Sequence, residues 1–94
     1  MIHVLIERYI ARGMLSTYEK NCAMALQQTC VVPGYISGET FADQHDENHR
    51  FVLCKWRTLK DWENWYRSHE RMDLMGMITP ILEKPEKITA LKNK

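Results

Sequence analysis

The sequence predicts a single α+β domain, in which a four-stranded antiparallel sheet carries its helices on one face. Three observations predict it. Apolar and polar residues alternate near the N-terminus, as they do in a strand, and the spacing becomes helical from Leu15 to Thr29. Residues 56–71 hold all three tryptophans and are again helical in spacing. The order β-α-β-β-α-α-β over residues 1–94 is that of a ferredoxin-like fold.

The first strand and the first helix are predicted from periodicity. One face of the strand, residues 2–10, carries Ile2, Val4, Ile6 and Ile10, and the other carries His3, Leu5, Glu7 and Tyr9. Gly13 ends the strand. The helix presents a stripe made of Leu15, Tyr18, Cys22, Leu26 and Thr29. Ser16 and Glu19, three residues apart, predict a capping box in its first turn.

The next two strands are predicted to form a hairpin. Pro-Gly at residues 33–34 breaks the chain, and the β-rich segment 35–42 follows. Within that segment Gly38 indicates a bulge or a close approach of the backbone. A polar loop then leads to residues 51–56, which are apolar except for Lys55.

Two short helices in series are predicted for the tryptophan-rich segment. Thr58 caps the first helix and Ser68 caps the second. The apolar positions are Leu59, Trp62 and Tyr66 on one face of the first helix with Trp65 beside them, then Met72, Met75 and Ile78 in the second. Prolines at positions 80 and 85 bracket the connection to a last strand, residues 87–91. A basic tail, residues 92–94, is expected to be mobile.

Composition excludes several classes of function. The formal net charge of +1 indicates no basic surface for nucleic acid or for an anionic membrane. Residues 1–10 are too short and too charged for a secretion signal, and no later apolar run approaches a membrane span, so a cytoplasmic protein is expected. The three cysteines have no Cys-x-x-Cys spacing and are expected to be reduced core residues. No metal and no flavin is expected, because ligand clusters and phosphate-cradling glycine loops are absent from the sequence.

The predicted strands carry apolar side chains on both faces, although helices cover only one. The uncovered face would bear Leu5, Tyr9, Phe51 and Leu53. Such a large apolar patch predicts that a second sheet covers it. A homodimer through the sheet face supplies that sheet most simply.

Four segments of the chain occur in an order that is typical of one protein family. They are Pro33 to Thr40, which contains Pro-Gly-Tyr, Trp56 with the helix after it, Ser68-x-Glu70-Arg71, and Pro80-Ile81-Leu82 to Pro85. At these separations they resemble the antibiotic biosynthesis monooxygenase (ABM) family, in particular its small stand-alone bacterial members. The resemblance covers essentially the whole chain. It implies a dimeric α+β barrel, formed by two ferredoxin-like sheets packed face to face, with a small-molecule pocket between helices and sheet in each subunit.

That family includes cofactor-free monooxygenases of aromatic polyketides and quinols, haem-degrading enzymes, and proteins with no assigned activity. The haem-degrading branch is matched only at Trp65, since its histidine falls near Met75 and its asparagine near Ile6 or Glu7. Haem degradation is therefore not expected. The expected function is a cofactor-independent monooxygenase acting on a small aromatic or quinol substrate. The alternative is a non-catalytic dimer that binds a small ligand or serves a stress-related role.

A cofactor-free monooxygenase needs a base near a substrate hydroxyl and apolar walls that exclude water. The candidate walls are Trp65, Trp62, Tyr35, Met72 and Met75. His69 is the first candidate base, because imidazole titrates near neutral pH, and Glu7 is the second. Each has a structural alternative. Tryptophans at helical spacing also build a core, His69 also suits a solvated helix start, and Glu7 can pair with a basic residue across the strands.

Other charged residues suggest further sites. His45 and His49 have the spacing of a helical zinc site, but their place between two strands indicates a solvated hairpin loop. Arg71, Lys84 and Lys87 are candidates to contact an acidic ligand, or simply solvate a surface. An RNA-binding domain of this topology is not indicated, because the third strand lacks the required pattern of stacking aromatics.

Overall fold

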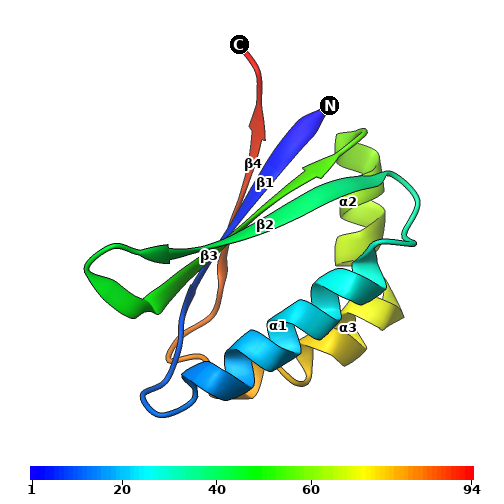
Figure 1. Ribbon diagram of the computed structural model, residues 1–94. Coiled ribbons are helices and arrows are strands. Elements are labelled where there is room, and N and C mark those ends of the chain that lie inside the picture. The colour runs from blue at the N-terminus through cyan, green and yellow to red at the C-terminus, as the bar shows by residue number, and fades with distance from the viewer.

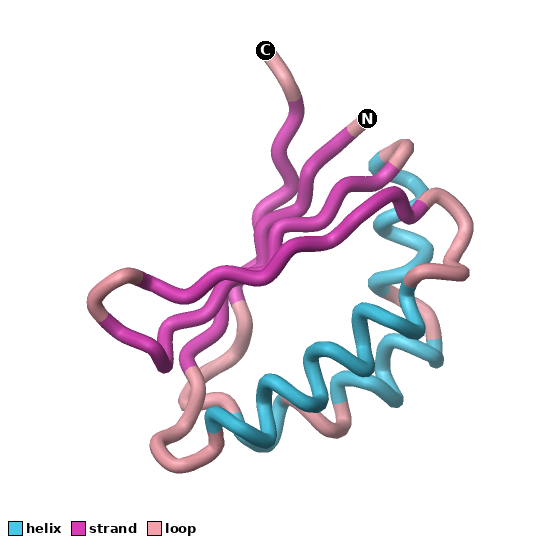
Figure 2. Tube along the Cα trace, viewed as in Figure 1, coloured by secondary structure: helices cyan, strands magenta, loops and turns pink.

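A four-stranded antiparallel sheet forms one layer of the fold, and three α-helices form the other (Figures 1 and 2). The computed structural model describes residues 1–94. The elements are β1 (Ile2–Tyr9), α1 (Leu15–Thr29), β2 (Tyr35–Asp43), β3 (Asp46–Trp56), α2 (Leu59–Tyr66), α3 (His69–Met75), a 3₁₀ turn (Thr79–Ile81) and β4 (Lys87–Lys92). This is the predicted element order, and the ferredoxin-like fold class is confirmed. No α-helix has the length and hydropathy needed to cross a lipid bilayer.

The strand order across the sheet is β2-β3-β1-β4, so the N-terminal strand lies inside the sheet. On one side of β1, Val4 lies opposite Cys54 of β3. On the other side, Ile6 lies opposite Ile88 of β4. Because side chains alternate along a strand, opposed residues share a face of the sheet. The register thus brings Val4, Ile6, Cys54 and Ile88 together on the face that the helices cover. Lys92, predicted to lie in a mobile tail, still belongs to β4.

The core lies between this face and the helices. Its buried hydrophobic members are Val4, Ile6, Ile10, Tyr18, Cys22, Val52, Cys54, Trp56, Trp62, Trp65, Leu74, Ile78 and Ile81. The orientation of α2 differs from the prediction, because Trp62 and Trp65 are buried while Leu59 and Tyr66 are 46% and 49% exposed. Turning both indole rings inward buries more apolar surface than turning a leucine and a tyrosine inward, and that difference decides the rotation of the helix.

The predicted N-caps of the short helices α2 and α3 are confirmed. The capping box predicted for α1 is wrong. The Thr58 hydroxyl accepts a hydrogen bond from the Asp61 N–H at 3.1 Å, and the Ser68 hydroxyl accepts one from the Arg71 N–H at 3.2 Å. Helix α1 instead begins after Met14, whose side chain caps nothing. Ser16 therefore lies inside the first turn, too far along the helix to act as its cap.

The hairpin between β2 and β3 is tighter than predicted. Strand β3 begins at Asp46, so most of the predicted polar loop belongs to the sheet. The carboxylates of Asp43 and Asp46 accept hydrogen bonds from the backbone N–H groups of His45 and Asn48, at 2.7 and 3.0 Å, which stabilises the turn. A register shift between Tyr35 and Ser37 provides a bulge just before Gly38. A Cβ atom at Gly38 would collide with the Tyr35 hydroxyl, so the residues that approach Gly38 closely do so through their side chains.

The face of the sheet away from the helices is uncovered in one chain (Figure 1). The register places Leu5 opposite Leu53 on this face, with Phe51 beside them. Phe41 and Leu91 also point this way and are 46% and 43% exposed. The face is thus apolar enough for the predicted dimer, which stays a prediction.

Candidate functional site

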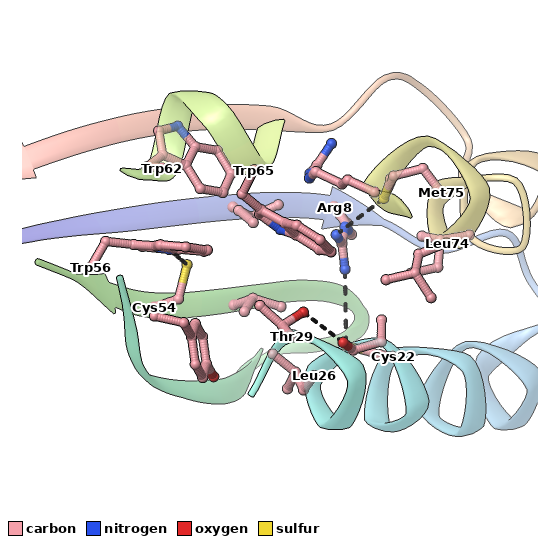
Figure 3. A pocket seen from close by; sticks show the side chains of 16 residues that line it. Arg8, Cys22, Leu26, Thr29, Cys54, Trp56, Trp62, Trp65, Leu74 and Met75 are labelled. Atoms are coloured by element: carbon pink, nitrogen blue, oxygen red, sulfur yellow. Dashed lines mark hydrogen bonds between the residues drawn. The ribbon is translucent and has the colours of Figure 1, made fainter. Parts of the chain in front are cut away.

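A small cavity lies between the sheet and the three helices (Figure 3). Its volume is about 50 Å³, counted as the space open to the centre of a water molecule. A space of that size is enough for a few water molecules. The cavity is predominantly apolar, since 13 of its 16 lining residues are hydrophobic. It is smaller than the bicyclic aromatic molecule that the predicted activity would require.

Aromatic side chains dominate the wall of the cavity. Trp56, Trp62 and Trp65 all line it. The ring of Trp56 meets Trp62 edge to face, with centroids 5.7 Å apart, and meets Tyr35 in the same way at 5.4 Å. The indole N–H of Trp56 donates to Cys54 Sγ at 3.3 Å. These rings hold one another in place, so the wall is rigid at the end nearest β3.

Four of the five side chains predicted to form a pocket wall do line the cavity. They are Trp62, Trp65, Tyr35 and Met75. The prediction is wrong for Met72, which is 62% exposed and does not line the cavity. Helix α3 turns Arg71, Leu74 and Met75 inward, and Met72 then falls on the opposite side of the helix.

A wider groove lies on the surface, beyond the inner cavity. Its volume is about 420 Å³, and it runs between the end of α1 and the two short helices. Polar and apolar side chains both line it: Gln28, Val31, Val32, Pro33, Asp61, Asn64, Trp65, Ser68, Glu70 and Leu74. Trp65 and Leu74 line both spaces. These two side chains are therefore the partition between the inner cavity and the groove.

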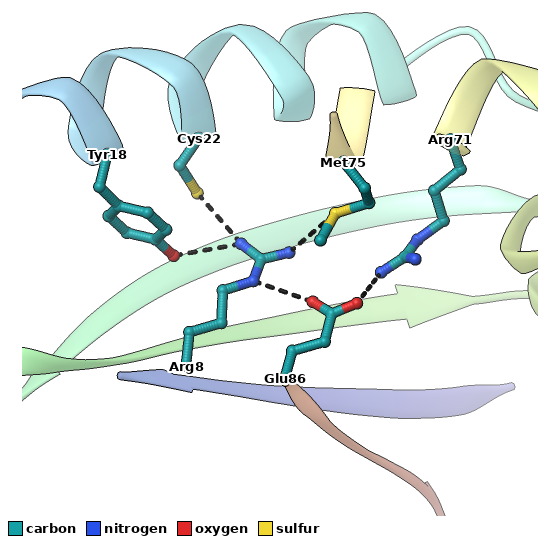
Figure 4. Close-up of polar contacts among 6 residues, drawn as sticks. All are labelled: Arg8, Tyr18, Cys22, Arg71, Met75 and Glu86. Carbon is teal, nitrogen blue, oxygen red and sulfur yellow. Dashed lines mark hydrogen bonds and ion pairs between the residues drawn. The ribbon is translucent and has the colours of Figure 1, made fainter. Parts of the chain in front are cut away.

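Three charged side chains, those of Arg8, Arg71 and Glu86, meet beside the cavity (Figure 4). Arg8 Nε donates to Glu86 Oε1 at 3.0 Å, and Arg71 Nη2 donates to Glu86 Oε2 at 2.8 Å. The side chains of Arg8, Arg71 and Glu86 are only 5%, 10% and 12% exposed. Both arginines line the cavity, whereas Glu86 lies behind them. One carboxylate thus serves two guanidinium groups.

Arg8 is a charged residue of the cavity wall that the predicted site lacks. It follows Ile6 on the inward face of β1, where alternation calls for an apolar side chain. A charged residue at an inward position of a buried strand is the signal that marks it.

The remaining partners of Arg8 come from the helices. Its Nη1 donates to the Tyr18 hydroxyl at 3.1 Å and approaches Cys22 Sγ at 3.9 Å, and its Nη2 approaches Met75 Sδ at 3.8 Å. Burial lowers the pKa of Arg8, but Tyr18 and Glu86 outweigh burial, so the net pKa is raised and the group stays charged. Burial raises the pKa of Tyr18 to about 12, so its phenol is neutral.

Neither predicted base lies in the cavity. His69 is the exposed first residue of α3 and is not among the residues that line the cavity. Glu7 lies on the other face of the sheet, where it accepts a hydrogen bond from His49, and this bond lowers the pKa of Glu7. No histidine, aspartate or glutamate lines the cavity at all. The arrangement therefore offers an apolar chamber with two cationic groups and no carboxylate or imidazole base.

One of the cysteines and one residue of the His45–His49 pair lie elsewhere than predicted. Cys22 and Cys54 are buried and line the cavity, whereas Cys30 is exposed, which corrects the prediction that all three lie in the core. Burial raises the pKa of Cys54, so its thiol stays protonated. His49 lies in β3 rather than in a solvated loop. The structure contains no group of three or more His, Cys, Asp and Glu side chains placed to hold a metal ion.

Comparison with known proteins gives a family and a fold. The family model described as antibiotic biosynthesis monooxygenase matches residues 1–74. No curated protein sequence matches the chain. Among solved structures, one described as an antibiotic biosynthesis monooxygenase superimposes with a TM-score of 0.89 at 14% identity, covering 100% of this chain and 99% of the other.

Two further solved structures have the same fold. A conserved protein from Methanosarcina mazei Go1 superimposes with a TM-score of 0.90 at 15% identity, covering 99% of this chain and 92% of its own. SnoaB from Streptomyces nogalater, described as a cofactor-independent oxygenase, has a TM-score of 0.85 at 9% identity, with 99% and 93% covered. At such identities the likeness establishes the fold alone.

Proposed function

The chain belongs to the antibiotic biosynthesis monooxygenase family, and from this premise we propose that it is a cofactor-independent monooxygenase of a small aromatic or quinol substrate. The observation that carries the proposal is the apolar cavity, with Trp65 in its wall, between the helices and the sheet. The similar fold of SnoaB, described as a cofactor-independent oxygenase, supports it.

In the proposed reaction the substrate supplies the two electrons that reduce one oxygen atom of dioxygen to water. A phenol or quinol loses its hydroxyl proton, and the anion reacts with dioxygen at a ring carbon to form a carbon–oxygen bond. Cleavage of the oxygen–oxygen bond releases water, which takes up the ring hydrogen and the hydroxyl proton, and a quinone is left. The task of the protein is to bind and orient the anion and to exclude water. Trp62, Trp65, Tyr35 and Met75 are the proposed walls.

The substrate enters, in this proposal, from the surface groove. The inner cavity of about 50 Å³ is too small for a bicyclic substrate, while the groove outside it is about eight times larger at 420 Å³. Trp65 and Leu74 separate the two spaces. A rotation of Trp65 toward the groove would join them and would make a single site of suitable size.

We propose that the active form is a homodimer joined through the uncovered sheet face. The apolar side chains of Leu5, Phe51 and Leu53 on that face support this assembly. The two cavities would then lie on the outer, helical sides of the dimer. Each groove would stay open to solvent, so that the substrate can enter without dissociation of the dimer.

Oxygen consumption tests the proposed function. The wild-type protein is mixed with a panel of reduced naphthoquinols and naphthols, and oxygen uptake is recorded against the spontaneous rate. We expect catalysed uptake with one dioxygen consumed per quinone formed, and one ¹⁸O atom in the quinone when ¹⁸O₂ is supplied. Leu59→Ala, an exposed change in the same helix as Trp65, is the matched control and should keep the wild-type rate.

The alternative is a non-catalytic protein that binds a small ligand, and one observation favours it. The cavity is small and contains no histidine or carboxylate to act as a base. Under this alternative, aromatic ligands quench the fluorescence of the tryptophan wall, but no member of the panel accelerates oxygen uptake. That combination of results would replace the monooxygenase proposal.

A further inference from the structure

The cavity carries an uncompensated positive charge. Arg8 and Arg71 both line it, and the single carboxylate of Glu86 stands behind them. No other acidic side chain reaches its wall. Two guanidinium groups and one carboxylate, each at most 12% exposed, leave one net positive charge beside the cavity. The single carboxylate balances the charge of only one of the two guanidinium groups, so a site of this kind gains from binding an anion.

The two guanidinium groups retain capacity to bind such an anion. Two of the contacts of Arg8 are with sulfur atoms, Cys22 Sγ at 3.9 Å and Met75 Sδ at 3.8 Å, which are weak acceptors that an oxygen anion would readily replace. Arg71 makes one side-chain hydrogen bond, to Glu86, and otherwise lies over the rings of Trp62 and Tyr66. Guanidinium groups with free N–H donors suit a carboxylate or phenolate oxygen.

The protein itself does not supply the missing negative charge. The phenol of Tyr18, which touches Arg8, has a pKa of about 12 and stays neutral. The thiol of Cys54 has a raised pKa because it is buried. Glu7 lies on the far face of the sheet. The countercharge must therefore arrive with the ligand.

We propose that the cavity is an anion site, and that its ligand is an aromatic monoanion whose oxygen contacts Arg8 and Arg71. This inference rests on the cavity being the ligand site of the proposed function, but it does not require turnover. It names the substrate class as a phenolate or aromatic enolate rather than the neutral phenol. It also explains the absence of a carboxylate or imidazole base. Two nearby cations favour the ionised form of a bound phenol, so the proton can leave to solvent as the ligand binds.

An ionisable probe tests the proposal on the wild-type protein. The probe is 4-nitrophenol, whose phenolate absorbs at a longer wavelength than the phenol, and the neutral comparison is 4-nitroanisole. At a pH just below the pKa of the free probe, we expect binding to increase the phenolate absorbance. We expect the phenolate to bind about tenfold or more tightly than the anisole, as opposite charges at close range require.

A matched pair of variants separates charge from structure. Arg71→Gln and Glu86→Gln both break the ion pair between these residues, but they change the charge of the site in opposite directions. Arg71→Gln should weaken phenolate binding about tenfold, whereas Glu86→Gln should strengthen it. The double variant should bind with nearly wild-type affinity. Arg67→Gln, on an exposed residue 72% accessible to solvent, is the control for long-range charge and should leave the affinity unchanged.

The results that overturn the proposal are distinct from those that overturn the monooxygenase function. Equal binding of phenolate and anisole, or no binding of either, overturns the anion site. Weaker phenolate binding in both single variants also overturns it, because the buried charges would then be structural only. If a variant does not fold, the absorbance of the probe on the wild type decides. Anion binding without oxygen uptake would leave this inference standing and remove the proposed activity.

Discussion

Arg71 and Glu86 form an ion pair of 2.8 Å in which neither side chain is more than 12% exposed. The same carboxylate binds Arg8 at 3.0 Å, so that β1, α3 and the segment before β4 are joined at one point. Removal of the carboxylate would leave two buried cations without a partner. We expect Glu86→Ala to lower the free energy of unfolding by about 3–5 kcal/mol, measured by urea denaturation.

The exposed pair between Glu63 and Arg67 provides the comparison. Its atoms are 3.8 Å apart, and its side chains are 48% and 72% exposed. Glu63→Ala should change the free energy of unfolding by less than about 0.5 kcal/mol. A similarly small loss for Glu86→Ala would mean that the buried arrangement contributes no more than a surface pair.

Truncation of Trp65 should affect both stability and ligand binding. The side chain is 8% exposed and separates the cavity from the groove. We expect Trp65→Ala to cost about 3–5 kcal/mol in unfolding free energy, because the side chain is buried in the core. We also expect it to abolish the binding of a naphthoquinol. Binding is measured by the quenching of the fluorescence of the remaining tryptophans. Leu59→Ala, in the same helix, should preserve both properties, and unchanged binding by Trp65→Ala would argue against this wall as the ligand site.

The oligomeric state can be tested at the centre of the uncovered sheet face. Leu53 lies opposite Leu5 on one side and opposite Glu39 on the other. We expect the wild type to form a stable dimer that buries more than about 2,000 Å² in total. Leu53→Arg should convert it into a folded monomer in light scattering, whereas Val31→Arg on the helical side, at a residue 86% exposed, should remain dimeric. A wild-type monomer at micromolar concentration would refute the prediction.

Acid stability should depend on Glu7. The hydrogen bond from His49 lowers the pKa of Glu7 below its ordinary value of 4.5. A carboxyl group of this kind stabilises the fold above its unfolded pKa, and this contribution disappears as the pH falls through the folded value. We therefore expect the Tm of the wild type to decrease more steeply than that of Glu7→Gln as the pH is lowered from about 5 toward 3. Parallel curves for the two proteins would show that the hydrogen bond has no effect on stability.

The role of His69 can be tested by a single change. The residue is exposed at the start of α3 and does not reach the cavity. If the substrate enters as an anion, His69→Ala should leave the rate of oxygen uptake unchanged within about twofold. A loss of a hundredfold, typical of a missing general base, would restore His69 as the proton acceptor. Circular dichroism would verify that α3 is intact.

The parts of the fold that depend on neighbours in sequence could be predicted. Thr58 and Ser68 act as caps through N–H groups three residues away, so local spacing was sufficient. The alternation of β1 likewise placed Leu5 and Tyr9 on the uncovered face. What failed depended on packing. Met72 and Met75 share one periodic pattern, and only the docking of α3 decides which of them faces inward.

Only one member of the Arg8–Glu86 ion pair could be predicted from the sequence. Arg8 stands at an inward position of an apolar strand, which marks it as unusual. Its partner Glu86, however, is 78 residues away in the sequence. No periodicity joins two residues at that separation, so the ion pair follows only from the pairing of β1 with β4. Arg71 was a candidate to contact an acidic ligand, but its contact with Glu86 is likewise set by the packing of α3 against the segment before β4.

The central position of β1 has a consequence for how the chain folds during synthesis. Ile2 pairs with Lys92, and Glu7 pairs with Lys87, so one edge of the first strand has no partner until residues 87–92 have been made. Contacts between such distant residues slow folding. An apolar strand with a free edge also invites pairing with other chains. We therefore expect chains truncated before residue 87 to aggregate rather than fold.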